Sequence, residues 1–304
     1  MDDYQINRQR VFGPYVRRDL RGIEIGPGYR PTFPKSDGYA VTIVDHCSTA
    51  ELIAKYDADT NVPADLVSQI EAVDVVWHEA SYQNLPGMAD GVDYIAASHV
   101  IEHTTDLCGF LKDCSALLKE GGTLLLVIPN RLCVLDFYRP ASTPGDVLLA
   151  HLMSHAYDLK SHLDEVWYGA LLDGGGAWSM AHLQATQDSH SPLPQHPISV
   201  AGAVWDHLKA RDTTVTSGQP YRDAHRWVLD PVNFEELAGF LGAYAETNLR
   251  LEAMPEAFGC EFYAVLRKSS GSNATSIDEL ESIRARAMQA RLSRAGAVHS
   301  ALPA

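Results

Sequence analysis

Short apolar runs alternate with helical patterns along residues 21–130. The spacing of Leu, Phe and Cys over 107–118 predicts an amphipathic helix, and 64–72 predicts a shorter one. Ser48 and Glu51 have the spacing of a capping box, which predicts that a helix begins after the second run. Five runs have the length and composition of strands: 22–25, 41–45, 73–77, 93–98 and 123–128. Strands that alternate with helices predict an α/β fold with a doubly wound, mostly parallel sheet.

A long segment without a strand pattern, residues 131–226, interrupts this alternation. After it, Asp230 and Pro231 mark the start of a helix, and the runs 249–254 and 261–267 predict two further strands. An insertion of this length in a compact domain usually carries substrate contacts. We therefore divide the chain into a lead-in or lid (1–20), a cofactor-binding core (21–130), an inserted cap (131–226), the rest of the core (227–268), and a linker, helix and tail (269–304).

The first predicted strand leads into Gly26 and Gly28, a spacing that lets the backbone approach a ligand closely. The second ends at Asp45, where such folds hydrogen-bond a ribose diol. Pro31 occupies the position where a dinucleotide site needs a small residue, so a pyrophosphate has no cradle. The pattern predicts a phosphate-free nucleoside cofactor such as S-adenosylmethionine, and the acidic Glu24 suits its charged methionine part. Taken alone, the glycine pair is equally explained as an ordinary turn.

Composition narrows the class of protein. With 46% hydrophobic residues, the chain of 304 residues can bury a sizeable core. Its 24 basic and 39 acidic residues give a net charge of −15, which argues against nucleic acid as a partner. No apolar run approaches the roughly 20 residues of a membrane span, and the start lacks a signal-peptide core, so we expect a cytoplasmic protein. The five cysteines form no Cys-x-x-Cys pair, so no disulfide framework is expected.

Two further motifs, VDYIAASHVIEH at 92–103 and LLKEGGTLLLVIPN at 117–130, complete a family resemblance. In order and spacing, residues 20–130 resemble the class I S-adenosylmethionine-dependent methyltransferases. Within them the chain is similar to a bacterial group linked to glycan and polysaccharide biosynthesis. The stretches that carry this narrower similarity are 45–49, 98–103, 137–151 and 225–227.

The resemblance implies a seven-stranded, Rossmann-like sheet whose last strand is antiparallel, with S-adenosyl-L-methionine as cofactor. In the family, an acidic or polar residue after the third strand meets the adenine, and Glu79 is the nearest match here, at a slightly unusual distance from Leu85-Pro86. Ser98 and His99 follow the fourth strand, and carboxyl ends of parallel strands face ligands in doubly wound sheets. We therefore expect both to face the cofactor.

Methyl transfer to a sugar hydroxyl needs a positioned base, because a protonated hydroxyl is a poor nucleophile. Histidine is the natural base near neutral pH, and we predict His151, which ends a short helix that begins near Pro144. His155, one turn further on, and His225 are the alternative catalytic histidines. Each is equally explained as a hydrogen-bonded surface histidine. His99 is more simply a wall of the cofactor pocket, and His103 a buttress of the turn.

Three residues are candidates for binding the acceptor. Asp136 and Arg139 can hydrogen-bond sugar hydroxyls, although a structural ion pair explains them equally well. Trp227 can stack on a sugar ring, although core packing is as good an explanation. The Asp and His residues have no recognisable ligand spacing, so we expect no catalytic metal.

The predicted function is thus S-adenosylmethionine-dependent O-methylation of a mannoside- or rhamnoside-like saccharide or glycoconjugate. Two alternatives remain open: a methyltransferase for another small metabolite with a phenol- or quinone-like acceptor, and a catalytically silent binding module of the same fold. A homodimer is possible, since the sequence does not fix the oligomeric state.

Overall fold

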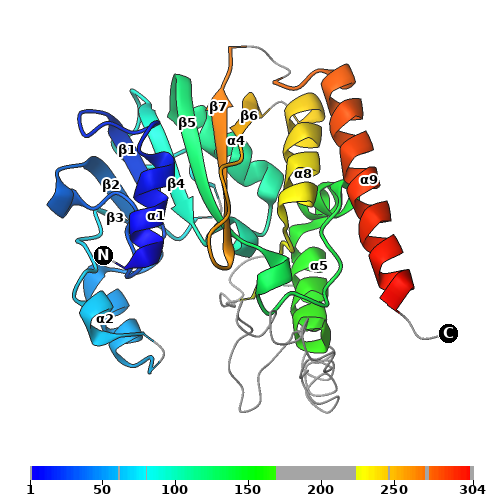
Figure 1. Cartoon of the computed structure of the whole chain (residues 1–304). Coiled ribbons are helices and arrows are strands. Elements are labelled where there is room, and N and C mark those ends of the chain that lie inside the picture. Colours follow the sequence, from blue (N-terminus) through cyan, green and yellow to red (C-terminus); the bar gives the residue numbers. More distant parts are fainter. Residues whose placement is uncertain are drawn as a thin grey trace.

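The computed structural model describes residues 2–60, 62–79, 81–168, 224–245, 247–270 and 274–301. Its centre is a seven-stranded sheet with the order β3-β2-β1-β4-β5-β7-β6 (Figure 1). The strands are β1 (Arg21–Ile25), β2 (Ala40–Asp45), β3 (Val75–Val76), β4 (Val92–Ser98), β5 (Leu118–Pro129), β6 (Leu249–Ala253) and β7 (Glu261–Lys268). Strand β7 pairs antiparallel with both β5 and β6, whereas the pairs among β1 to β5 are parallel. The predicted α/β sheet, including its antiparallel last strand, is confirmed.

Helices connect the strands and cover both faces of the sheet. The α-helices are α1 (Asp3–Phe12), α2 (Thr49–Asp57), α3 (Ala64–Val67), α4 (Leu107–Leu117), α5 (Pro144–Tyr168), α8 (Pro231–Tyr244) and α9 (Ile277–Ala301). Short 3-10 turns lie at η1 (Lys35–Asp37), η2 (Ile101–His103) and η3 (Arg131–Cys133). The capping box predicted at Ser48 caps α2, and Asp230 caps α8 with Pro231 as its first residue.

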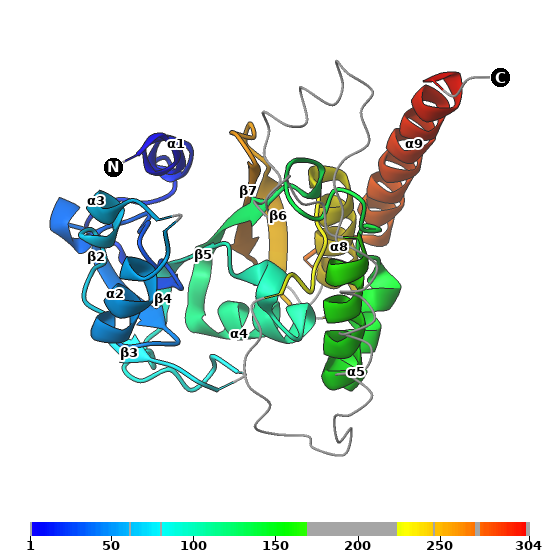
Figure 2. The same cartoon turned by 90° about the horizontal axis from the view of Figure 1, so that it is seen from below.

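Two apolar clusters lie on opposite faces of the sheet. The larger joins strand residues such as Ile23 and Leu126 to the buried sides of α4, α5 and α8. The smaller joins Tyr94 and Tyr263 to Phe12 of α1. Helix α1 lies on the opposite side of the sheet from α4 (Figures 1 and 2). Because both faces are covered, the central strands read as near-continuous apolar runs in the sequence.

Three boundaries differ from the sequence prediction. Strand β3 is limited to two residues at the edge of the sheet, where it pairs only with β2, and α3 ends at Val67. Strand β5 begins at Leu118 and not at the predicted residue 123, because Leu118, which directly follows α4, is already extended and pairs with Val92 of β4; Gly121 and Gly122 follow it. The glycines therefore lie inside β5, where Gly121 has a positive φ of 74°.

Helix α9, which lies in the segment 269–304 where the sequence predicts a helix, packs against α8. Gly239 permits the close approach, since a Cβ there would lie 2.9 Å from the side chain of Ile283. Arg286 bonds Glu235 at 2.6 Å, and Arg291 pairs with Glu236. The last described helix thus extends the layer that covers this face of the sheet.

Helix α1 is joined to the sheet by a buried ion pair. The guanidinium of Arg8 donates two hydrogen bonds to the carboxylate of Glu261 on β7, and both side chains are almost fully buried. Glu261 also accepts a hydrogen bond from the hydroxyl of Tyr263 and lies 2.9 Å from Nε2 of His99. The residues before the core therefore form a packed layer with a direct link to the carboxyl end of β4.

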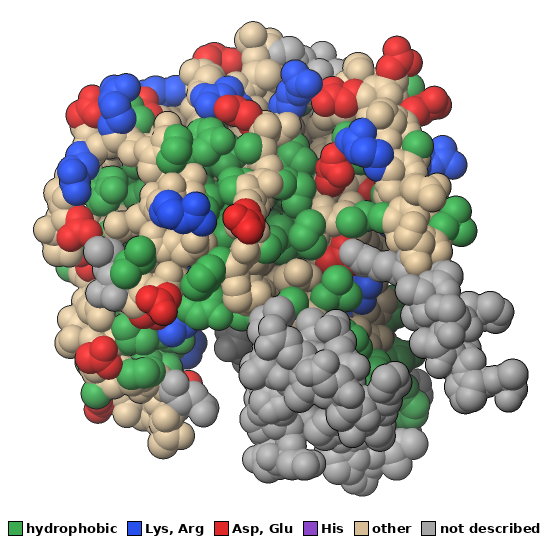
Figure 3. All heavy atoms as spheres, viewed as in Figure 1, with side chains coloured by type: hydrophobic (Ala, Val, Ile, Leu, Met, Phe, Trp, Pro, Cys, Tyr) green, Lys and Arg blue, Asp and Glu red, His purple; other side chains and the backbone are tan. Residues whose placement is uncertain are grey.

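The surface facing the viewer in Figure 1 mixes positive and negative side chains around a hydrophobic centre (Figure 3). None of the helices among the described residues combines the length and hydrophobicity that crossing a bilayer requires.

The Arg8–Glu261 pair predicts a large stability effect. Replacing Arg8 by Met leaves a buried carboxylate without its main partner, which should lower the free energy of unfolding by about 3–5 kcal/mol. Arg17→Met is the matched control, because Arg17 pairs with Asp19 on the open surface and should leave the urea midpoint unchanged. Equal midpoints for the two variants in urea unfolding would contradict this view of α1.

The same pair predicts a pH dependence of stability. Burial alone would raise the pKa of Glu261, but hydrogen bonds from His99 and Arg8 lower it from the usual 4.5 to about 2. The ionised Glu261 therefore stabilises the fold above pH 4.5, and this contribution is lost as the pH falls toward 2. The stability advantage of the native protein over Glu261→Gln, measured by urea unfolding, should shrink below pH 4.5. A constant difference between pH 6 and pH 3.5 would refute it.

Candidate functional site

A pocket of about 310 Å³ opens at the carboxyl ends of the first four strands. Its walls come from the ends of β1, β2 and β4, from helix α2, and from the segments that follow β3 and β4. Three residues predicted from sequence lie in this wall: Gly26, Asp45 and His99. The position agrees with the rule that open α/β sheets bind ligands beyond the carboxyl ends of their strands.

The glycine turn after β1 has the backbone that its sequence predicts. Gly26 and Gly28 have positive φ angles of 59° and 52°, a region that residues with a side chain rarely adopt. A Cβ on Gly28 would lie 2.9 Å from the hydroxyl of Tyr56, which lines the pocket. Glu24 lies beneath the turn, fully buried, and its carboxylate accepts hydrogen bonds from the backbone N–H groups of Thr32 and Phe33. Glu24 thus holds the returning loop and is not part of the pocket wall.

The hydrogen bonding of the Asp45 carboxylate shows whether the pocket can hold the ribose of a nucleoside. One carboxylate oxygen accepts from the backbone N–H of His46 at 2.7 Å. The other, Oδ2, is buried and accepts no hydrogen bond from any described residue. A buried oxygen without a donor is costly, and a ribose hydroxyl in the pocket would supply one. The arrangement therefore fits the diol of an adenosine.

Aromatic side chains that the sequence prediction missed form the rest of this wall. Trp77 directly follows β3, and Tyr82 lies on the next turn, where its backbone N–H bonds Asp113 at 2.8 Å. Burial raises the pKa of Tyr82 to about 12, so its hydroxyl is neutral. Trp77 directly follows β3, just as Asp45 ends β2. The rule that ligands bind at the carboxyl ends of strands therefore also applies to Trp77. By contrast, Glu79 is exposed and does not line the pocket.

At the end of β4, Ser98 is buried and outside the pocket wall, whereas His99 takes the left-handed conformation, with φ 54°, and lines the pocket. Burial would lower the pKa of His99, but the carboxylates of Glu102 and Glu261 outweigh it and raise the pKa. The His99 ring is therefore held between two carboxylates.

A cluster of Glu102, His103 and His225 lies beside this end of the pocket. Each offers one ligand-type atom, and these three atoms lie within 4.8 Å of one another. His103 lines the pocket, and its ring meets the ring of His225 edge to face, with centroids 5.0 Å apart. Glu102 is fully buried; burial would raise its pKa, but the histidines around it lower it, His99 foremost. This end of the pocket thus lies next to a buried carboxylate and two imidazoles.

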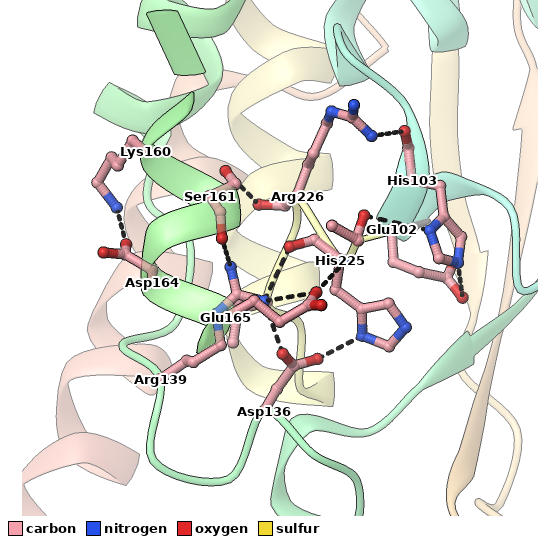
Figure 4. A network of polar contacts seen from close by, with 12 residues as sticks. Glu102, His103, Asp136, Arg139, Lys160, Ser161, Asp164, Glu165, His225 and Arg226 are labelled. Atoms are coloured by element: carbon pink, nitrogen blue, oxygen red, sulfur yellow. Dashed lines mark hydrogen bonds and ion pairs between the residues drawn. The ribbon is translucent and has the colours of Figure 1, made fainter. Parts of the chain in front are cut away.

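The predicted acceptor residues form the support of this cluster (Figure 4). Asp136 accepts from Nδ1 of His225 at 2.6 Å and from Arg139 at 2.7 Å, and both members of this ion pair are buried. Burial would lower the pKa of His225, but Asp136, then Glu102 and Glu165, raise it to about 9. Trp227 is buried in the larger core cluster and donates from its indole to the carbonyl of Thr104 at 2.8 Å.

The other two predicted catalytic histidines lie on α5. His151 bonds Asp106, the N-cap of α4, at 2.7 Å and lines a separate pocket of about 210 Å³ between α4, α5 and α8. This pocket shares no residue with the one that holds Asp45. The side chain of His155 lies outside the described part of the structure, as does the inserted segment 169–223. Of His151 and His225, the structure places only His225 beside the cofactor-side pocket, in contact with His103 of its wall.

Comparison with known proteins gives a family. The family model described as a methyltransferase domain matches residues 3–186. A probable S-adenosylmethionine-dependent methyltransferase of Mycobacterium tuberculosis, found in two strains, is 29% identical over 129 residues. That match covers 42% of this chain and 42% of the relative, so it spans less than half the length of each.

Solved structures that resemble the chain are also methyltransferases. A protein from Methanosarcina mazei is 10% identical over 85% of this chain and 97% of its own, with a TM-score of 0.40. The CcbJ methyltransferase from Streptomyces caelestis is 13% identical over 88% and 97%, also at 0.40. The glycopeptide N-methyltransferase MtfA, complexed with sinefungin, is 20% identical over 42% and 55%, at 0.30.

The unpartnered oxygen of Asp45 predicts the effect of an isosteric change. Asp45→Asn should weaken binding of S-adenosylmethionine about 10- to 100-fold, because an amide cannot accept hydrogen bonds from both ribose hydroxyls as a carboxylate does. Isothermal titration calorimetry measures this directly. Glu79→Gln, on the exposed segment after β3, is the control and should bind as tightly as the native protein. Equal affinities for all three proteins would remove Asp45 from the site.

Proposed function

The chain belongs to the class I S-adenosylmethionine-dependent methyltransferases, and from this premise we propose that it methylates a hydroxyl group of a sugar in a saccharide or glycoconjugate. The cofactor supplies an electrophilic methyl group attached to a positively charged sulfur. The protein must therefore hold the nucleoside, bring an acceptor oxygen to about 3 Å from the methyl carbon, and exclude water.

Residues of the first three strands hold the nucleoside in this proposal. The turn at Gly26 lets the ligand approach the backbone, and Asp45 accepts hydrogen bonds from the ribose. Trp77 and Tyr82 supply flat apolar walls for a base. His99 and Val100, at the end of β4, line the part of the pocket that lies next to His103 and Thr104. We place the reacting methyl group and the acceptor at this polar end.

One observation carries the choice of a hydroxyl acceptor: the Glu102–His103–His225 cluster lies against that polar end. As the acceptor oxygen bonds to the methyl carbon, the carbon–sulfur bond breaks and leaves its electron pair on sulfur. The hydroxyl proton must leave in the same process, and a cluster of carboxylate and imidazole groups is suited to promote that loss. We assign the role predicted for His151, that of proton acceptor, to the carboxylate of Glu102, whose pKa the surrounding histidines lower, and to His225 the role of keeping that carboxylate ionised.

A sugar fits this site better than a flat aromatic acceptor. The groups around the acceptor end are a threonine, histidines and carboxylates, which suit a ligand rich in hydroxyl groups. The net charge of −15 disfavours polyanionic acceptors. The similarity of residues 98–103 and 225–227 to enzymes of glycan biosynthesis supports the same choice, and the cluster draws its residues from these two stretches.

Transfer of a labelled methyl group tests the acceptor class. With labelled S-adenosylmethionine, we expect label to pass to mannosides or rhamnosides and not to matched amino sugars blocked at their hydroxyls. Phenols and quinols form a second panel. Label found only on amines, phenols or carbon would overturn sugar O-methylation, and no transfer to any panel, with the cofactor bound, would favour a silent binding module.

A pair of histidine variants tests the assignment of the catalytic cluster. His225→Ala should lower kcat by about 10²–10⁴-fold while affinity for S-adenosylmethionine stays nearly constant, because the change affects proton loss and not the nucleoside. His151→Ala is matched to it, since His151 also pairs with a carboxylate at short range, and should keep kcat within a few-fold. The reverse ranking in steady-state assays would return the role to His151.

A further inference from the structure

We propose that Glu102, His103 and His225 bind a divalent metal ion of the zinc class beside the acceptor end of the pocket. The three residues come from two distant stretches, η2 and the segment before α8. Their ligand-type atoms converge within 4.8 Å (Figure 4). Two imidazoles and one carboxylate form a common ligand set of catalytic zinc sites.

The carboxylate of Glu102 lacks a partner at close hydrogen-bond distance among the described residues. The residue is fully buried, and neither of its carboxylate oxygens accepts a hydrogen bond from a described residue. Its nearest charged neighbours are Nδ1 of His99 at 3.4 Å and Nε2 of His103 at 3.8 Å, which are too far for strong hydrogen bonds. A buried carboxylate without hydrogen bonds is costly unless it is paired with a cation or coordinates a metal.

Both histidines are oriented as metal ligands usually are. Asp136 holds Nδ1 of His225 at 2.6 Å, and the backbone carbonyl of Ala224 holds Nδ1 of His103 at 3.2 Å. A hydrogen bond at one ring nitrogen directs the other, Nε2, to the metal, and a bound ion would displace the proton that Nε2 of His225 carries near neutral pH. Carboxylate–histidine and carbonyl–histidine pairs are the usual partners in such sites.

The geometry favours a small ion with nitrogen ligands. In a tetrahedral zinc site with ligands at about 2.0–2.2 Å, ligand atoms lie about 3.4 Å apart, so a pair of ligand atoms at the 4.8 Å limit would have to close by about 1.4 Å. Magnesium and calcium prefer sites made of oxygen ligands, which this set does not provide. The carboxylates of Asp136 and Glu165, both bonded to His225, add negative charge that attracts a dication.

Three protein ligands leave a fourth position of a tetrahedral ion open, and His103 borders the pocket. This part of the inference rests on the proposed function: an acceptor hydroxyl in that position would be bound through its oxygen. Coordination to such an ion would lower the pKa of the hydroxyl, so the hydroxyl would lose its proton to bulk solvent before the methyl transfer and its oxygen would be a stronger nucleophile. The cluster would then promote proton loss through the ion, with His225 as a ligand.

Metal binding to the whole protein is the direct test. The protein is freed of metal with a chelator and titrated with zinc chloride by calorimetry. We expect one tight site in the native protein and in His151→Ala, the control that removes a histidine–carboxylate pair elsewhere. Glu102→Gln and His225→Ala should bind zinc at least about 100-fold more weakly. Zinc should also raise the Tm of the first two proteins and leave that of Glu102→Gln unchanged.

A measurement on the native protein keeps the test independent of how the variants fold. Cobalt(II) in this site should give the intense visible absorption of a tetrahedral ion with nitrogen and oxygen ligands, at one equivalent per chain. A weak octahedral spectrum, or zinc binding that does not depend on Glu102, would overturn the proposal. The calorimetric, Tm and cobalt measurements need no acceptor. If the protein binds the metal but methylates no sugar, the proposed function is wrong and the metal site stands. If sugar methylation survives complete removal of metal, the proposed role of the metal in proton loss is wrong and the proposed function stands.

Discussion

The site depends on how the segment before α8 is joined to the end of β4. The backbone carbonyl of Glu102 accepts hydrogen bonds from the N–H groups of Arg226 and Trp227, at 2.6 and 3.1 Å. Arg226 returns a hydrogen bond from its guanidinium to the carbonyl of His103 at 2.9 Å. This short exchange fixes two stretches that are far apart in the sequence, and it sets the spacing of the imidazole and carboxylate groups at the acceptor end.

Buried charge accompanies that junction and explains why it holds one geometry. Asp136 and Arg139 form an ion pair inside the protein, and the guanidinium also donates to the carbonyls of His225 and Ser161. Two of the guanidinium hydrogen bonds end on backbone carbonyls, so Arg139 also fixes the segment before α8 against α5 and does not simply neutralise Asp136. A pair of this kind is a poor source of net stability, because both ions lose their hydration, yet it penalises any arrangement that separates them. The buried pair thus fixes the geometry of this region at the cost of the hydration free energy of both ions.

Much of the fold and three residues of the pocket wall could be predicted from sequence, for identifiable reasons. Strand and helix periodicity is local, and the rule for carboxyl ends of strands placed Gly26, Asp45 and His99 correctly in the pocket wall. Trp77 obeys the same rule and was overlooked because an aromatic residue after a strand looks like core. Glu24 was assigned to the ligand, but its carboxylate caps backbone groups of the next loop.

The acceptor side could not be predicted in this way. No periodic pattern relates His225 to Glu102, because their proximity comes from tertiary hydrogen bonds and not from spacing in the sequence. His151 lies on a helix that begins at Pro144, as expected, but only the packing of α5 on α4 decides that its ring meets Asp106. Metal-ligand spacing is recognisable in a sequence when the ligands share one helix or loop. In the proposed metal site, Glu102 and His103 are adjacent in the sequence, but His225 is far from them.

Helix α1 does not line the pocket, but it is connected to it: Arg8 bonds Glu261, and Glu261 contacts the ring of His99 in the pocket wall. A tag, a cleavage or a partner that disturbs α1 would loosen the carboxylate that holds the His99 ring, without touching any group that contacts the ligand. A change in the position of α1 is therefore connected to the His99 side chain, which lines the pocket, through two direct contacts: Arg8 with Glu261, and Glu261 with His99.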